Sequence, residues 1–153
     1  WGSTPLAVLL QMVRDKERAA ANAVLLIGEI EGEDATAALL SLVAEMDPEI
    51  RAAAVRGLGG RPGEEIRKTL LKCLRDPNGA IRGEAAEALR AHQDAEVTKA
   101  LVRLLWDLDT DVCLSAVRAL ANRPAIDISS VFEPISKITR NVSRNPRKNW
   151  RDI

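Results

Sequence analysis

The chain has 153 residues, of which 46% are hydrophobic and 3% aromatic, and its 22 basic and 22 acidic side chains balance. This length favours a single domain, and because no run of 18 apolar residues occurs, a membrane partner is not expected. The two cysteines match no metal or redox spacing, which argues against a disulfide framework and favours a reducing, cytoplasmic location.

One segment of the sequence recurs every 31 residues. Residues 50–58 read IRAAAVRGL, residues 81–89 read IRGEAAEAL, and residues 112–120 read VCLSAVRAL. The period extends back by one further unit, to Ala23 and Ile27. A fixed period in this range indicates stacked structural units, none of which buries its apolar face alone. Because strand-like alternation of apolar and polar residues is missing, the sequence predicts an all-α fold.

Each unit is predicted to contain two helices. Apolar residues at i, i+3 and i+4 predict the first helix of three successive units over 34–44, 65–75 and 96–106. An acidic residue stands near the start of each, where the helix dipole favours negative charge. Trp106 closes the last of these helices, and it is either exposed or covered by the C-terminal segment. We expect it to be buried, since exposed indoles are uncommon outside binding sites.

The second helix of each unit is predicted over 48–58, 79–91 and 110–121. One residue before each lies a strong N-cap, whose side chain accepts hydrogen bonds from free N–H groups of the first turn: Asp47, Asn78 and Asp109. Pro48 follows at the first helical position, where its missing N–H costs nothing. Short side chains recur in one register and allow these helices to approach closely: Ala23, Ala54, Ala85 and Ala116.

The segments DPEIRAAAVRGLG at 47–59 and IRGEAAEAL at 81–89 resemble HEAT-like repeats of the short, phycobilin-lyase type. The resemblance covers residues 5–122. It implies an all-α, right-handed α–α superhelix, a solenoid of about four and a half two-helix repeats. We therefore expect the solenoid to occupy residues 1–142 and a basic tail or linker to occupy residues 143–153.

The C-terminal tail differs from the repeats in charge and in pattern. Residues 140–153 carry five basic side chains and one acidic side chain, so the remaining 139 residues are mildly acidic. Pro146 would break a helix here, and no apolar periodicity is present. We expect the chain to cap the last repeat through about residue 142 and then to run on as a linker within a longer protein. The acidic main body argues against nucleic acid as a partner.

No catalytic or metal-binding constellation is found in the sequence, so an enzyme is not favoured and no cofactor is expected. His92 has no partners at metal or triad spacing, and we interpret it as a solvated residue at a helix end. Cys73 stands in a register of leucines and is expected in the core. Cys113 replaces Arg51 and Arg82, which we expect to brace the loop between helices; a reactive thiol is the weaker interpretation.

The resemblance implies that the second helix of each unit lines the concave side of the stack. Positions on that side that are not needed for packing give a predicted partner-binding surface: Arg18, Asn22, Leu25, Glu49, Arg56, Glu84, Glu87, Asp111, Ser115, Arg118 and Asn122. The alternating charges of Arg56, Glu87 and Arg118 have two compatible interpretations. They form a ladder of ion pairs between neighbouring helices, or they form a groove that recognises a partner.

The sequence therefore predicts a protein–protein interaction scaffold, since stacked repeats present extended surfaces rather than pockets. We expect another protein as the partner, bound along the concave face. The alternative comes from the resemblance alone: a subunit of a bilin lyase-like enzyme that binds an open-chain tetrapyrrole. In that case Arg56 and Arg118 are the basic groups available to the propionates.

Overall fold

The computed structural model describes residues 4–15, 18–121 and 123. Within this part of the chain it contains eight α-helices, a short 3₁₀-helix and no strand, which confirms the all-α solenoid. The helices are α1 (Pro5–Arg14), α2 (Ala20–Gly28), α3 (Glu33–Leu42), α4 (Pro48–Gly57), α5 (Glu64–Cys73), α6 (Gly79–Ala88), η1 (Leu89–Ala91), α7 (Ala95–Leu104) and α8 (Thr110–Leu120). The expected half repeat and the boundary at residue 142 lie outside the described residues.

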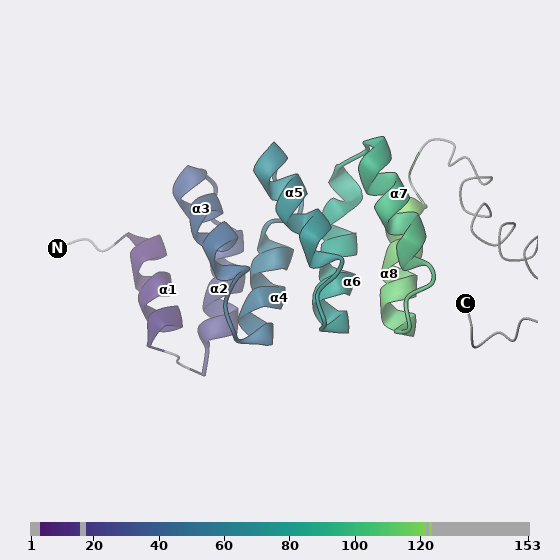
Figure 1. Cartoon of the computed structure of the whole chain (residues 1–153). Coiled ribbons are helices and arrows are strands. Elements are labelled where there is room, and N and C mark those ends of the chain that lie inside the picture. Colours follow the sequence, from purple (N-terminus) through teal and green to yellow (C-terminus); the bar gives the residue numbers. More distant parts are fainter. Residues whose placement is uncertain (1–3, 16–17, 122, 124–153) are drawn as a thin grey trace, which may run out of the picture. The chain divides into compact units, whose positions relative to one another are not determined.

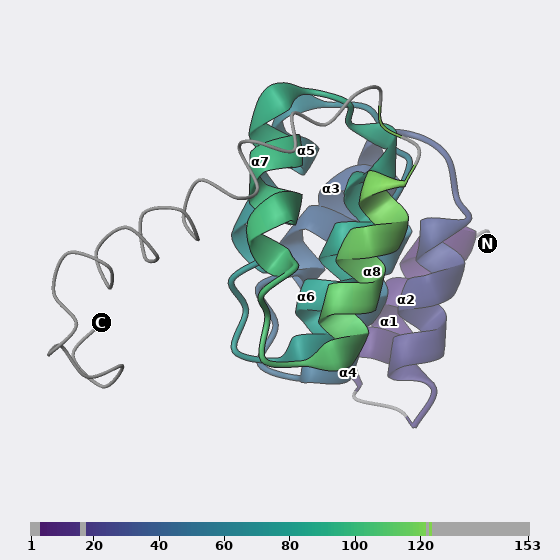
Figure 2. The same cartoon turned by 90° about the vertical axis from the view of Figure 1, so that its right-hand side faces the viewer.

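The helices form two layers (Figures 1 and 2). Helices α2, α4, α6 and α8 contact one another in succession and form what we call the inner layer. Helices α3, α5 and α7 form the outer layer, and each packs on the inner helix of its own unit. Contacts between successive units therefore run mainly through the inner layer.

Short side chains bring the helices of the inner layer together. The predicted alanine stripe is confirmed, because none of its members is more than 1% exposed: Ala23, Ala54, Ala85 and Ala116. Gly28 and Gly57 meet more closely still, since a Cβ atom added to Gly28 would lie 2.9 Å from the Cα of Gly57. Leu58 and Leu89 are fully buried beside this stripe, where they fill the space between the layers.

The inner helices α4, α6 and α8 begin at the predicted residues, whereas the outer helices begin one residue before the predicted starts and end two residues before the predicted ends. The side chains of Asp47, Asn78 and Asp109 each accept a hydrogen bond of 2.8–2.9 Å from the backbone N–H two residues later. The outer helices were expected to run two residues further, through positions 44, 75 and 106. Instead the chain tightens there into turns with i→i−3 hydrogen bonds, such as the 3.0 Å bond from the Arg75 N–H to the Lys72 carbonyl.

Arg82 braces the loop between two helices and also bridges two units. Its guanidinium donates to the carbonyl oxygens of Asp76 and Pro77 at 2.9 and 3.2 Å. It also donates two hydrogen bonds, of 2.8 and 2.7 Å, to the carboxylate of Asp107 in the next unit. Arg51 makes the same contacts one unit earlier, including an ion pair with Asp76 at 3.5 Å. The predicted bracing role of these two arginines is confirmed.

Cys113 ends this series of bracing arginines. Its Sγ atom lies 3.2 Å from the carbonyl oxygen of Asp107, so the contact with the loop is kept. The short thiol lacks the guanidinium with which Arg51 and Arg82 bridge two units. Cys73 is buried in the core as expected, and this burial raises the pKa of its thiol to about 11.

The inside–outside assignment can be tested with two leucines. Leu89 is 0% exposed and lies in the middle of the stack, whereas Leu26 is 56% exposed. Leu89→Ala should lower the free energy of unfolding by about 2–5 kcal/mol, the usual range for a buried leucine. Leu26→Ala should cost less than about 1 kcal/mol. Equal losses in urea titrations would show that the assignment is wrong.

Acid should weaken the bridge between Arg82 and Asp107. Hydrogen bonds from Arg82 hold the pKa of Asp107 below its ordinary value. Such a carboxylate stabilises the fold above its ordinary pKa, and this contribution is lost as the pH falls through the lower, folded-state pKa. We expect Asp107→Asn to be less stable than the wild type at neutral pH, and its Tm to fall less between about pH 5 and pH 2. Parallel Tm profiles for the two proteins would contradict this assignment.

Candidate partner-binding face

The inner layer carries the residues predicted to bind a partner. Asn122 lies outside the described residues. Of the others, six are exposed: Arg18, Asn22, Glu49, Arg56, Asp111 and Arg118. Four are partly buried: Leu25, Glu84, Glu87 and Ser115. They are carried by the inner helices, apart from Arg18, which precedes α2.

Two hollows bring part of this set together. The first has a volume of about 490 Å³ and its polar lining comes from Arg56, Glu84, Glu87 and Arg90. The second has a volume of about 380 Å³, and its lining includes Glu84, Glu87, Asp111, Ser115 and Arg118. Because Glu84 and Glu87 line both hollows, the two form one strip across α4, α6 and α8. The strip carries both basic and acidic side chains. Its two hollows are open to solvent and do not enclose a small molecule.

The ion pairs in this strip differ from the expected ladder. Arg56 binds Glu84 with two hydrogen bonds, of which the Nε to Oε2 bond is 2.9 Å long. These bonds raise the pKa of Arg56 further. The pair spans 28 residues rather than the 31 of the repeat, because Glu84 lies one helical turn before Glu87 on the same face of α6. A ladder that joins Arg56 to Glu87 is therefore wrong.

Glu87 and Arg118 are the less constrained members of the strip. Glu87 accepts a long hydrogen bond of 3.3 Å from Arg90, which lies in the 3₁₀-helix η1 that directly follows α6. Arg118 is exposed, and no residue in the described ranges forms an ion pair with it. The strip thus combines a fixed pair, Arg56 with Glu84, and charges that are available to a partner.

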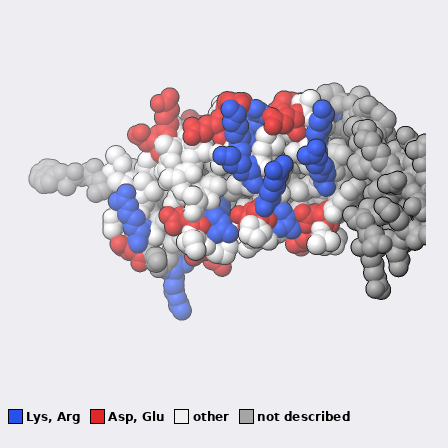
Figure 3. Space-filling view, viewed as in Figure 1, with Lys and Arg blue, Asp and Glu red and all other residues white. Residues whose placement is uncertain are grey.

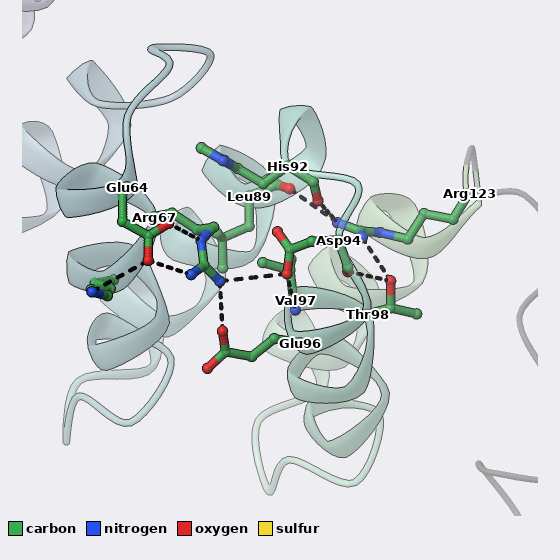
Figure 4. Close-up of polar contacts among 10 residues, drawn as sticks. Glu64, Arg67, Leu89, His92, Asp94, Glu96, Val97, Thr98 and Arg123 are labelled. Carbon is green, nitrogen blue, oxygen red and sulfur yellow. Dashed lines mark hydrogen bonds and ion pairs between the residues drawn. The ribbon is translucent and has the colours of Figure 1, made fainter.

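The structure also contains a pair of bridging arginines that the sequence analysis missed. Arg123 is 8% exposed, and its burial lowers the pKa of its guanidinium. It donates to the carbonyls of Leu89 and His92 at 3.0 and 2.7 Å, and to the Thr98 hydroxyl at 2.9 Å (Figure 4). Buried carbonyls of the preceding unit are thereby satisfied.

Arg61 makes the equivalent contacts two units earlier. It donates to the carbonyls of Gly28 and Ile30 at 2.8 and 2.7 Å, and to the Thr36 hydroxyl at 2.7 Å. Both members of each Arg–Thr pair recur after two periods of the repeat. This double recurrence in the printed sequence is the signal that could have identified them.

His92 occupies the position of this arginine in the intervening unit. The side chain is partly buried, and its Nε2 atom is fully buried without a hydrogen-bond partner in the described part of the chain. The interpretation of His92 as a solvated residue is therefore wrong. An imidazole is too short to reach the carbonyls that Arg61 and Arg123 bind.

Arg67 replaces the threonine of the same unit and supplies a different bridge. Its guanidinium contacts Glu64 at 2.7 Å, Glu96 at 2.6 Å and Asp94 at 3.5 Å, which joins α5 to the start of α7 (Figure 4). The hydrogen bonds from Arg67, and then from Lys68, lower the pKa of Glu64 to about 2. In this unit an ionic cluster takes the place of the arginine–carbonyl bridge.

In the ranges that the structure describes, no group of three or more His, Cys, Asp or Glu side chains could hold a metal ion. None of the described helices has the length and apolar character required to cross a membrane. The charged strip of the inner layer is the feature that the candidate function has to explain.

In the unit of α5 and α6, Arg67 stands in place of the threonine and His92 in place of the arginine. We therefore expect the stability effects of substitutions at these two positions to be coupled. His92→Arg alone would add a second guanidinium near Arg67, where no threonine is present to accept from it. Arg67→Thr alone would remove the ion-pair partner of Asp94 and Glu96 and leave Glu64 with Lys68 alone. The double variant restores the arrangement seen at Arg61, so we expect it to be more stable than the sum of the single changes by about 1–3 kcal/mol. Additive free energies of unfolding in a four-protein denaturation cycle would contradict this coupling.

Comparisons with known proteins agree with this architecture. No curated protein matches the chain. A solved structure of an engineered protein, determined by the Northeast Structural Genomics Consortium, is similar at 24% identity and a TM-score of 0.59. The match covers 86% of this chain and 68% of that one, and it shows a shared fold alone. The model of the HEAT repeats family matches residues 36–121, more than half of the chain. The chain belongs to the HEAT repeat family.

Proposed function

We propose that this chain is a protein-interaction module that binds a partner along the inner layer. HEAT repeats generally mediate protein–protein interaction, and stacked repeats offer long surfaces for it. The observation that carries the proposal is the continuous mixed-charge strip that Arg56, Glu84, Glu87 and Arg118 form across three inner helices. The full set of partner-binding residues given above remains part of this proposal.

The fixed ion pair favours recognition over a purely structural role. The carboxylate of Glu84 is largely shielded, whereas the Arg56 side chain is 60% exposed. An exposed ion pair adds only about 0–1 kcal/mol to stability. Because Glu84 holds the guanidinium of Arg56 in place, a partner carboxylate would meet a preorganised donor and would lose little conformational freedom in binding it.

The remaining charges set the polarity expected of the partner. Glu87 and Asp111 flank Arg118 on the second hollow, so this end of the strip is mainly acidic. The first hollow has Arg56 and Arg90 on its rim. A segment with an acidic residue opposite the arginines and a basic residue opposite Glu87 would complement both ends.

The alternative, a subunit of a bilin lyase-like enzyme, is less well supported. Arg56 is already engaged by Glu84, so only Arg118 remains free among the two arginines proposed to hold the propionates. Titration of the chain with an open-chain tetrapyrrole, followed by the absorbance of the pigment, separates the two functions. A reducing, cytoplasmic compartment suits either function, since Cys73 and Cys113 are free thiols.

The proposed surface predicts a selective loss of partner binding. Arg56→Glu combined with Arg118→Glu should weaken binding of a partner captured from the source cell by tenfold or more, because both changes place repulsive charge in the strip (about 1.4 kcal/mol per factor of ten). The far-UV circular dichroism signal should stay helical. Quantitative pull-down or surface plasmon resonance measures the loss.

A matched control carries the same change in charge on the other layer. Lys72→Glu combined with Arg103→Glu reverses two exposed cations on α5 and α7. This control should leave binding along the inner layer unchanged. If the Arg56 and Arg118 variant retained its partner, or if both double variants lost it equally, the inner-layer assignment would be wrong.

A further inference from the structure

The outer layer carries a second charged surface, distinct from the strip of the inner layer. Five exposed cations lie on α5, on α7 and in the turn after α5: Lys68, Lys72, Arg75, Lys99 and Arg103. Figure 3, which views the outer layer, shows basic side chains gathered over these two helices, with acidic side chains nearer the helix starts. We call these five residues the basic face.

Helix geometry and the repeat explain how the basic face is assembled. In α5 the buried residues are Ile66, Leu70 and Cys73, so Lys68 and Lys72 point away from the core. The 31-residue period places Lys99 and Arg103 at the same positions of α7. Two neighbouring helices therefore present matching rows of positive charge. The equivalent positions of α3 hold Ala37 and Ser41, so the face is confined to two units.

Most of the basic face forms no ion pair with the residues that the structure describes. Lys68 forms an ion pair with Glu64 at 3.3 Å. In the described ranges no ion pair involves Lys72, Arg75, Lys99 or Arg103. The bridging arginines of this fold, by contrast, are tied to carboxylates or carbonyls. These four cations therefore do not stabilise the stack through ion pairs with the described residues.

Apolar side chains border the basic face where α7 ends. Trp106 follows Arg103 by one turn and is 55% exposed, against the expectation that it is buried. Leu108 lies in the same loop and is fully exposed. An exposed tryptophan beside an arginine is a typical anchor of a protein interface. The surface thus combines positive charge with an apolar end.

The surroundings favour a short acidic partner over a long polyanion. Glu64, Glu65 and Glu96 stand at the starts of α5 and α7, so carboxylates border the face on that side. Residues 1–123 contain 16 basic and 19 acidic residues, so the field beyond the face is negative. A duplex nucleic acid or an anionic membrane would extend over these carboxylates, whereas a short peptide would not.

We propose that the basic face, together with Trp106 and Leu108, binds a short acidic segment of a partner protein. The acidic side chains of the segment contact Lys72, Lys99 and Arg103, and an apolar side chain packs on Trp106. This surface lies on the outer layer, so the proposal is independent of binding along the inner layer. The two surfaces select different chemistry, since the inner strip holds both charges.

The probe is a fluorescein-labelled peptide of about 15 residues, rich in Glu and Asp with leucine at regular intervals. The full chain is added in increasing amounts, and the fluorescence anisotropy of the peptide is measured at about 0.05 and 0.15 M salt. A peptide with Gln and Asn in place of the acidic residues serves as the control. We expect the acidic peptide to bind, the control peptide not to bind, and the affinity to fall with salt.

Three variants locate the site. Lys72→Glu with Arg103→Glu should weaken binding about tenfold, because each reversal replaces an attraction by a repulsion. Trp106→Ala should weaken it severalfold through the apolar contact alone. Ala37→Glu with Ser41→Glu adds two negative charges at the equivalent exposed positions of α3, the same change in net charge as Lys72→Gln with Arg103→Gln, and should leave the affinity unchanged. Every variant keeps the basic residues of 140–153. Any binding of the peptide to these residues therefore contributes equally in all variants and does not affect the comparison.

Other outcomes would overturn the proposal. Equal losses in the double variant of α3 and in Lys72→Gln with Arg103→Gln would mean that only net charge matters. Tighter binding of a labelled DNA duplex, or of phosphatidylserine vesicles, with the same dependence on Lys72 and Arg103 would assign the face to a nucleic acid or to a membrane. No binding of the acidic peptide at low salt would exclude the site. Lys72→Gln with Arg103→Gln repeats the test without adding negative charge, and circular dichroism verifies that each variant is folded.

Discussion

The fold depends on the close approach of α2, α4, α6 and α8. Alanines with at most 1% exposure and the Gly28–Gly57 contact allow this approach, and a larger side chain in the stripe would force neighbouring units apart. One side of each inner helix is committed to this packing and another to the outer layer. Only the remaining side is free to vary, and the charged strip lies there. Packing thus decides where a partner can be recognised.

Arginine side chains connect successive units through three kinds of contact. Arg82 joins two loops, Arg61 and Arg123 join helix ends to the preceding unit, and Arg67 joins α5 to α7. A planar guanidinium with five N–H donors can bind several carbonyls and a carboxylate at once, which lysine cannot do. The stack can therefore substitute one bridge for another, as His92 and Arg67 show, without losing the connection between units.

Periodicity predicted the features that depend on a single residue and its register. The caps at Asp47 and Asp109 and the alanine stripe need only local helix geometry, so the sequence was sufficient for them. Side-chain pairs depend on how far adjacent helices are shifted along their axes, and the period contains no such information. This is why Arg56 was expected to meet Glu87 and meets Glu84 instead. The role of His92 was missed for a related reason, because its register becomes visible only when Arg61 and Arg123 are compared over two periods.

The charges of this chain fall into two groups with different consequences. Guanidiniums bound to backbone carbonyls, such as Arg61 and Arg123, are part of the structure, and a partner could reach them only by breaking the stack. Arg118 on the inner layer and Lys72 and Arg103 on the outer layer are exposed, and they carry the chemistry left for recognition. Because the buried side chains of Leu70 and Leu101 lie between the two layers, a ligand on one surface does not cover the other. Under the two proposals made above, a single short stack would hold two partners at once and bring them within one molecule's width of each other.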